Sequence, residues 1–158
     1  MKSNTTIQSK NFFRRHWFII LSGVFCIALD QILKHFARTY PSVTHYLVPH
    51  IIGWEYFENT GIAFSIPIPQ FIIIPMTIVI IIIGGIMVKK EQKNKVHLLG
   101  AGLIIAGALS NLTDRMLYGI TIDYIRVFTS IFNIADLAII LGGILVLKKN
   151  KNYSNLSN

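Results

Sequence analysis

Two aspartates in the C-terminal part of the chain could carry out acid–base chemistry together. Asp123 lies in the mostly apolar segment ITIDYI, and Asp136 lies in FNIAD. Two carboxylates that meet in a low-dielectric site cannot both ionise easily, so they share a proton. One carboxylate can then act as a base on a water molecule while the other acts as an acid. This chemistry hydrolyses a peptide bond without a metal or a covalent intermediate.

Asp136 also has a purely structural explanation. Asn133 is a good N-cap for a helix that begins at the next residue, and Asp136 then falls at the third helical position, where the helix dipole favours a carboxylate. This explanation is sufficient for Asp136 alone, so its catalytic role stays open here. It does not explain Asp123, which lies in a largely apolar segment away from any predicted helix start.

Two other polar segments interrupt apolar sequence. In GALSNLTDR, Asn111 precedes Asp114 by three residues and Arg115 by four, so a continuing helix would present all three on one face. Arg115 alone could simply reach toward lipid headgroups, but a face of three polar residues predicts a network that holds something in place. In ENTGIAF, Asn59 can bond to backbone and Gly61 permits a positive φ, which is also typical of an ordinary turn.

Asp30 and Lys34 have the spacing of a helical ion pair, with the acid four residues before the base, and this pattern favours a structural role. Other hydrolytic chemistries fit poorly. There is no HExxH motif, the five histidines lack ligand spacing, and no serine has an obvious lysine partner. The single cysteine, Cys26, excludes an internal disulfide and a cysteine-based metal cage. We therefore expect neither a metal nor another cofactor.

The elements that must position these residues are apolar enough for a lipid bilayer. Of 158 residues, 53% are hydrophobic and only 14% are charged. Apolar segments approach the length of about 20 residues that a helix needs to cross the hydrocarbon. We predict an all-α membrane protein, a four-transmembrane-helix bundle with a small extracytoplasmic β or loop cap at residues 35–70. The predicted helices cover about 17–36, 70–88, 96–113 and 133–148, within one domain at 17–147 between cytoplasmic tails at 1–16 and 148–158.

The distribution of charge predicts the orientation of this bundle. Most of the 15 lysines and arginines lie in the two tails and in the connection after residue 88, whereas all but one of the seven acids lie on the other side. By the positive-inside rule, both termini are cytoplasmic and the acidic chemistry is near the extracytoplasmic face. The small residues Gly100, Gly102, Ala106 and Gly107 allow close helix approach and place the third segment at the centre.

Three other functional classes fit the sequence less well than a protease does. The net charge of +8 is divided into short blocks between apolar segments, which does not match the clustered basic surface of a nucleic-acid-binding protein. A small ion- or proton-conducting membrane protein stays the alternative, although such proteins usually distribute acids through the membrane midplane. A membrane scaffold without chemistry leaves the energetic cost of Asp123 and Asp136 unexplained.

Taken together, these motifs resemble the lipoprotein signal peptidase family, also called signal peptidase II, over about residues 30–147. These are bacterial membrane aspartic proteases that remove the signal peptide from diacylglyceryl-modified prolipoproteins, cleaving just before the lipidated cysteine. The resemblance implies that Asp123 and Asp136 are the catalytic dyad. It implies a multi-pass protein of the bacterial cytoplasmic membrane whose partners are lipidated signal peptides and membrane lipid, and we expect it to function as a monomer.

The same resemblance assigns the other polar motifs. Asp30 and Lys34 match DQxxK and are expected to be structural. The residues expected to bind substrate or to position the dyad are Asn59, Gly61, Gly107, Asn111, Asp114, Arg115 and Asn133. The chain also departs from the pattern: Ser110 replaces a usual Gly, Ile122 and Tyr124 stand where Val and Phe are common, and the segment between the aspartates looks several residues shorter. A divergent paralogue with altered substrate preference therefore stays open.

Overall fold

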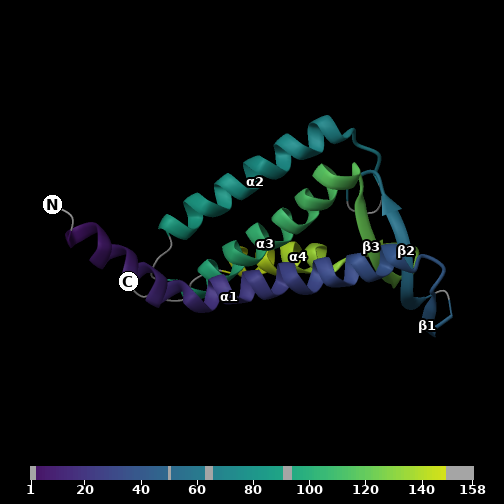
Figure 1. Cartoon of the computed structure of the whole chain (residues 1–158), viewed down its shortest axis with the longest axis horizontal. Coiled ribbons are helices and arrows are strands. Elements are labelled where there is room, and N and C mark those ends of the chain that lie inside the picture. Colours follow the sequence, from purple (N-terminus) through teal and green to yellow (C-terminus); the bar gives the residue numbers. More distant parts are fainter. Residues whose placement is uncertain (1–2, 50, 63–65, 91–93, 149–158) are drawn as a thin grey trace, which may run out of the picture.

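The protein is mostly helical, with a small antiparallel sheet at one end of its helices (Figure 1). The computed structural model describes residues 3–49, 51–62, 66–90 and 94–148, with side chains from residue 17 onward. The element order is α1 (Ser3–Thr39), β1 (His45–Val48), β2 (Ile52–Asn59), α2 (Gln70–Lys90), α3 (Lys95–Tyr118), β3 (Thr121–Val127), β4 (Ser130–Phe132) and α4 (Ile134–Leu147). The expected C-terminal tail lies, except for Lys148, outside the described residues.

Three helices are long and apolar enough to cross a membrane, at Trp17–Thr39, Gln70–Lys90 and Lys95–Tyr118, and α4 is shorter. The expected apolar helices are therefore present, but their bounds differ. The first helix begins at Ser3 rather than Trp17, because residues 3–16 contain neither Gly nor Pro to end it. The third continues to Tyr118, where Gly119 terminates it in the left-handed conformation with φ of 72°.

α3 lies at the centre of the helices, as the small residues of its sequence predicted, and packs against α1, α2 and α4. A Cβ atom added at Gly100 would lie 2.7 Å from the carbonyl oxygen of Gly142 in α4. A Cβ at Gly107 would lie 2.4 Å from the carbonyl oxygen of Ala135, also in α4. Glycine is therefore needed at both positions for α3 and α4 to approach this closely.

The sheet has the order β1-β2-β3-β4, with every neighbouring pair antiparallel. The sequence predicted strands only within residues 35–70, so β3 and β4 are additions. The first four residues of β3 alternate between polar and apolar types, but all four are buried, so Thr121 and Asp123 do not mark the solvent-exposed face that this pattern usually indicates. The β2–β3 register pairs Asn59 with Thr121 and Phe57 with Asp123.

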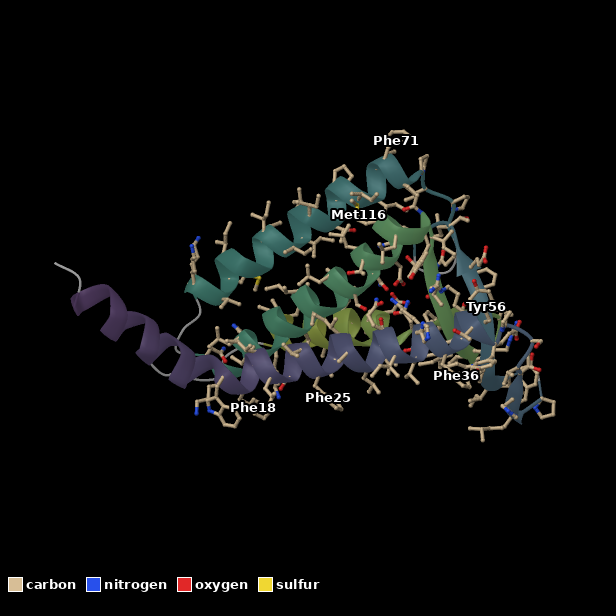
Figure 2. The ribbon with its side chains drawn as sticks, viewed as in Figure 1. Phe18, Phe25, Phe36, Tyr56, Phe71 and Met116 are labelled. Atoms are coloured by element: carbon tan, nitrogen blue, oxygen red, sulfur yellow. The ribbon has the colours of Figure 1, made fainter. Side chains whose placement is uncertain are left out.

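Much of the helical surface is apolar and exposed, as lipid contact requires. Phe18, Phe25 and Phe71 are between 58% and 76% exposed and point away from the other helices (Figure 2). The buried interior is unusually polar by contrast. Asp30, Lys34, Asp114 and Asp123 are each at most 1% exposed. Buried charges are retained only where they are paired or hydrogen-bonded, so this polar interior must form a connected network.

Candidate active site

Asp123 is held on β3 by two amide side chains from different parts of the chain. Asn133 donates its amide to Oδ1 at 2.6 Å, and Asn59 donates its amide to Oδ2 at 2.9 Å. Asn59 reaches Asp123 because it pairs with Thr121, which makes Asp123 its diagonal neighbour on the same face of the sheet. The β2–β3 register therefore brings together two residues that lie far apart in the sequence.

Asp136 lies in the first turn of α4 and forms a capping box with Asn133, so the predicted N-cap is confirmed. The backbone amide of Asp136 donates to Asn133 Oδ1 at 2.8 Å, and Asp136 Oδ2 accepts from the backbone amide of Asn133 at 3.3 Å. The other carboxylate oxygen, Oδ1, accepts from the side chain of Asn111 at 2.8 Å. The capping role accounts for only one of the two oxygens.

The two aspartates are joined through shared amides. Asn133 bonds to both Asp123 and Asp136, and it also donates to Asn111 Oδ1 at 3.1 Å. Asn111 in turn donates to Asp136. Oxygen and nitrogen atoms of side chains gather inside the molecule where α1 and α3 approach β3 (Figure 2). A bridged carboxylate pair of this kind is suited to holding one proton between two acids.

The pKa of Asp123 is raised to about 7, mainly by burial and then by the nearby carboxylate of Asp136, against the lowering effects of the Asn59 and Asn133 amides and of Lys34. A carboxyl group with a pKa near 7 can hold a proton at neutral pH and release it during a reaction. Asp123 therefore has the titration behaviour that an acid catalyst requires.

A buried layer of one cation and two acids lies beneath the aspartate pair. Lys34 Nζ lies 2.8 Å from Asp30 Oδ2 and 2.8 Å from Asp114 Oδ2, and it donates to Asn111 Oδ1 at 2.8 Å. The predicted ion pair between Asp30 and Lys34 is thus confirmed, but it is buried inside the bundle and not on a helix surface. Because Asn111 contacts both Lys34 and Asp136, this layer supports the orientation of the aspartate pair.

Arg115 and Gly61 lie at the edge of the same polar region. Arg115 Nη2 lies 3.5 Å from the carbonyl oxygen of Gly61, and the buried Nε has no hydrogen-bond partner among the described residues. A Cβ atom added at Gly61 would lie 2.1 Å from the carbonyl oxygen of Ile66, so this turn requires glycine. An arginine with unused donors next to two carboxylates could hold a carbonyl group of a bound peptide.

The structure brings nearly all of the predicted site residues into one network. Asp30, Lys34, Asn59, Asn111, Asp114, Asp123, Asn133 and Asp136 are connected by the contacts described above, while Gly107 contributes only through close helix packing. Three further polar residues take part without having been predicted as site residues. They are Gln31, which donates to Asp114 at 3.0 Å, Ser110 and Tyr124. Each of the three residues is next to a predicted site residue in the sequence, and this adjacency is the feature that could have identified them.

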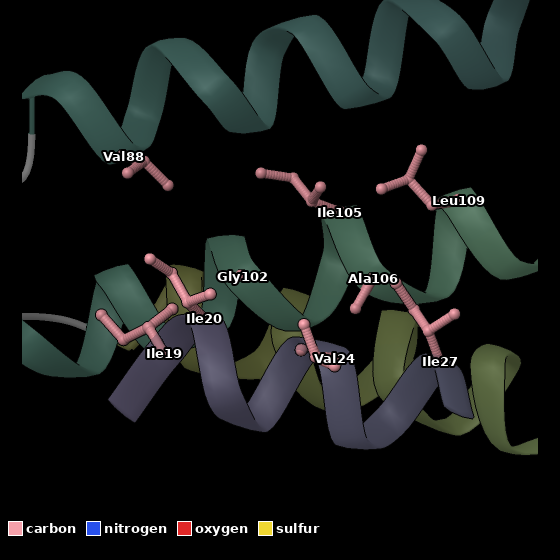
Figure 3. Close-up of a pocket in the computed structure, with 10 residues that line it drawn as sticks. Ile19, Ile20, Val24, Ile27, Val88, Gly102, Ile105, Ala106 and Leu109 are labelled. Atoms are coloured by element: carbon pink, nitrogen blue, oxygen red, sulfur yellow. The ribbon is translucent and has the colours of Figure 1, made fainter. Parts of the chain in front are cut away.

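No group of three or more potential metal ligands occurs among the described His, Cys, Asp and Glu residues. The polar region instead adjoins an apolar cleft of about 300 Å³ between α1, α2 and α3 (Figure 3). Val24 and Ile27 line this cleft from α1, and Ile105 and Leu109 line it from α3. Leu109 directly precedes Ser110, so α3 contributes neighbouring residues to the cleft and to the polar network.

The chain is similar to known proteins over most of its length. Residues 22–150 match the family model described as "Signal peptidase (SPase) II". The lipoprotein signal peptidase of Buchnera aphidicola subsp. Schizaphis graminum is 36% identical over 147 residues, which cover 85% of this chain and 94% of the relative. That of Caldanaerobacter subterraneus subsp. tengcongensis is 31% identical and covers 80% of this chain and 91% of the relative.

Two solved bacterial membrane enzymes share this fold. The first, solved by the in meso method at 2.3 Å resolution, superposes with a TM-score of 0.76 and 30% sequence identity, covering 82% of this chain and 85% of its own. The second, solved by the same method at 1.9 Å resolution, has a TM-score of 0.73 and 29% identity, covering 84% of this chain and 94% of its own.

Proposed function

The chain belongs to the signal peptidase II family, and from this premise we propose that it is a membrane aspartic endopeptidase that removes signal peptides from diacylglyceryl-modified prolipoproteins. Cleavage occurs just before the lipidated cysteine, and Asp123 and Asp136 are the catalytic pair. The observation that carries this proposal is that the buried carboxylate of Asp123 and the half-buried carboxylate of Asp136 both bond to Asn133, while Asn111 bonds to Asn133 and to the Asp136 carboxylate. A merely structural pair of acids would be expected to be neutralised by a direct cation, whereas amides bridge this one.

In this mechanism the pair holds one proton. The ionised carboxylate takes a proton from a water molecule as the water oxygen attacks the peptide carbonyl, and the protonated carboxyl group donates to the carbonyl oxygen. Collapse of the tetrahedral intermediate breaks the C–N bond: the leaving amine takes a proton from one carboxyl group, while the other carboxylate takes back a hydroxyl proton of the intermediate, which leaves a carboxylic acid product and one proton on the pair. Asn133 and Asn111 keep both carboxylates oriented throughout, and Arg115 holds the substrate backbone through its free donors.

We propose four membrane spans with both termini in the cytoplasm. α4 has 14 residues, which correspond to about 21 Å of helix. This is shorter than the roughly 30 Å of hydrocarbon. If Lys148 marks the cytoplasmic boundary, Asp136 lies below the extracytoplasmic surface and within reach of the membrane interior. A substrate anchored by lipid can then approach the pair laterally, and a site built entirely from one chain is consistent with a monomer.

The apolar cleft is proposed to hold an acyl chain of the substrate's diacylglyceryl group. Its volume of about 300 Å³ is lined only by apolar residues from three helices. It begins at Leu109, and Asn111, two residues further along α3, binds Asp136. A lipidated cysteine placed at the aspartate pair would therefore direct its chains into this cleft. The apolar lining also counts against the alternative of ion conduction, because an ion pathway needs polar groups along its length.

The decisive experiment is cleavage of a diacylglyceryl-modified prolipoprotein by the purified protein in lipid, with mass spectrometry of the N-terminus that is formed. We expect Asp123→Asn and Asp136→Asn each to abolish cleavage, because each removes one of the two groups that exchange the proton. Glu55→Gln is the matched control, since Glu55 pairs with Arg126 on the sheet outside the site. Retained cleavage in either aspartate variant would refute the assignment, and equal cleavage of unlipidated precursor would refute the lipid requirement.

A further inference from the structure

The first turn of α4 is held by side chains from β3, from α1 and from its own N-cap. The backbone amide of Ile134 donates to the hydroxyl of Tyr124 at 3.2 Å, and that of Ala135 donates to Asp30 Oδ1 at 3.2 Å. The amide of Asp136 donates to Asn133 Oδ1 at 2.8 Å. Amides at a helix start have no partner inside the helix, so such contacts decide how firmly the turn is held. Here β3 and α1 both fix the turn that carries Asp136.

Asp30 is the point where these contacts converge. Its Oδ2 accepts from the Ser110 hydroxyl at 2.7 Å and contacts Lys34 Nζ at 2.8 Å. Its Oδ1 accepts from the Tyr124 hydroxyl at 2.9 Å and from the amide of Ala135. A carboxylate has about four acceptor positions, so all of them are in use. Asp30, Ser110 and Tyr124 are each at most 1% exposed, so water cannot replace a lost donor.

Ser110 and Tyr124 lie on separate elements, α3 and β3, yet the hydroxyl groups of both donate to the same carboxylate. Neither contact can be made by a side chain without a hydroxyl group, such as alanine or phenylalanine. This convergence indicates that the two residues act as a unit.

We propose that Ser110 and Tyr124 are positioning residues that act together through Asp30 to hold the first turn of α4, and with it Asp136, in place opposite Asp123. Tyr124 directly follows Asp123 on β3, so one strand both supplies an aspartate and fixes the helix that carries the other. The catalytic consequence of this arrangement rests on the proposed function. The holding of the helix start does not.

The first test therefore needs no activity. Hydrogen–deuterium exchange of a peptide that covers the start of α4 is compared between the wild-type protein and Tyr124→Phe, Ser110→Ala and the double variant. We expect exchange at Ile134 to become faster by about tenfold in Tyr124→Phe, because its amide loses its acceptor, and exchange at Ala135 to become faster as well, because its acceptor Asp30 loses the hydroxyl that holds it. Ser110→Ala should accelerate it less. Unchanged exchange in Tyr124→Phe would overturn the proposal.

The controls remove similar hydroxyls elsewhere. Tyr56→Phe removes a hydroxyl that donates to Glu58 on the exposed sheet, and Ser22→Ala removes one that donates to a backbone carbonyl within α1. Both should leave exchange at the start of α4 unchanged. If Tyr56→Phe accelerates exchange as strongly as Tyr124→Phe, the effect is not specific to Asp30 and the proposal is wrong.

The second test measures kinetics on a lipidated precursor. We expect kcat to fall about tenfold in each single variant while KM changes less than about twofold, since substrate contacts are not removed. In the double variant we expect a fall of clearly less than the product of the two, because both residues act through Asp30. Multiplicative losses, or an unchanged kcat in a variant whose melting temperature falls, would overturn the positioning role. A wild-type protein without cleavage would refute the proposed function, while the exchange result still decides whether the helix start is held.

Discussion

Lys34 is the cation on which the buried layer beneath the aspartates depends, and its replacement by methionine gives a demanding test of that layer. The three donors of its ammonium group are all used, by Asp30, Asp114 and Asn111, each at 2.8 Å. Methionine has a similar length and no charge. Lys34→Met would therefore leave two buried carboxylates and one amide oxygen without this partner, in a region that is at most 1% exposed at all three charged residues.

The magnitude follows from the burial of the pair. Removing one partner of a buried ion pair destabilises a protein by about 3–5 kcal/mol, because the remaining charge is uncompensated. For a chain of this size, each kcal/mol lowers the melting temperature by about 2–4 °C. We therefore expect Lys34→Met to lower Tm by about 6–20 °C. Asp114 keeps its contacts with Gln31 and with the amide of Ile122, which places the expected loss toward the lower half of that range.

Thermal unfolding in detergent or in lipid nanodiscs, followed by circular dichroism, measures this loss. Lys148→Met is the matched control, since Lys148 is an exposed lysine after the end of α4, and its Tm should change by less than about 2 °C. Adding Asp114→Asn to Lys34→Met should restore part of the stability, because it removes one of the two unpaired charges. A Tm within 2 °C of wild type for Lys34→Met would refute the reasoning, whatever the double variant does.

Two further predictions concern the reaction itself. The pKa of Asp123 is raised to about 7, so Asp123 holds its proton below neutral pH and loses it above. We therefore expect kcat/KM for a lipidated precursor to fall about tenfold per pH unit above pH 7. A kcat/KM value that is constant from pH 6 to 9 would contradict this expectation. Val24→Trp fills the apolar cleft and should raise KM for the diacylated precursor several-fold. Phe25→Trp, on the outward face of α1, is the control and should leave KM unchanged. Equal KM values in the two variants would contradict the proposal that the cleft holds an acyl chain.

Local features of the fold could be predicted from the sequence, whereas contacts between distant segments could not. The cap at Asn133 and the ion pair between Asp30 and Lys34 depend on spacings of three and four residues, and both are confirmed. The burial of that ion pair was missed, because it depends on Ser110 and Tyr124, which lie 80 and 94 residues from Asp30. A helical spacing states which residues share a face, but not what packs against that face.

The segment between the aspartates shows how a site can tolerate a change in chain length. The sequence predicts a short segment, and in the structure this segment forms a hairpin of β3 and β4. The paired residues run from Ile125 with Phe132 to Val127 with Ser130, so only Phe128 and Thr129 form the turn. Phe128 has φ of 54°, an uncommon value for a bulky residue, so this tight turn is strained. The strain lies at the far end of the hairpin from Asp123 and Asn133.

That separation explains why the aspartates can still meet. Asp123 is fixed by Asn59 on the opposite strand and by Asn133 beyond the hairpin, and Asp136 is fixed by Asn111 on α3. None of these contacts involves the turn itself. Because β3 and β4 pair antiparallel, residues lost in matched pairs from the tip of the hairpin keep the register and do not move Asn133 relative to Asp123. Such variation in hairpin length is therefore compatible with one arrangement of the two aspartates.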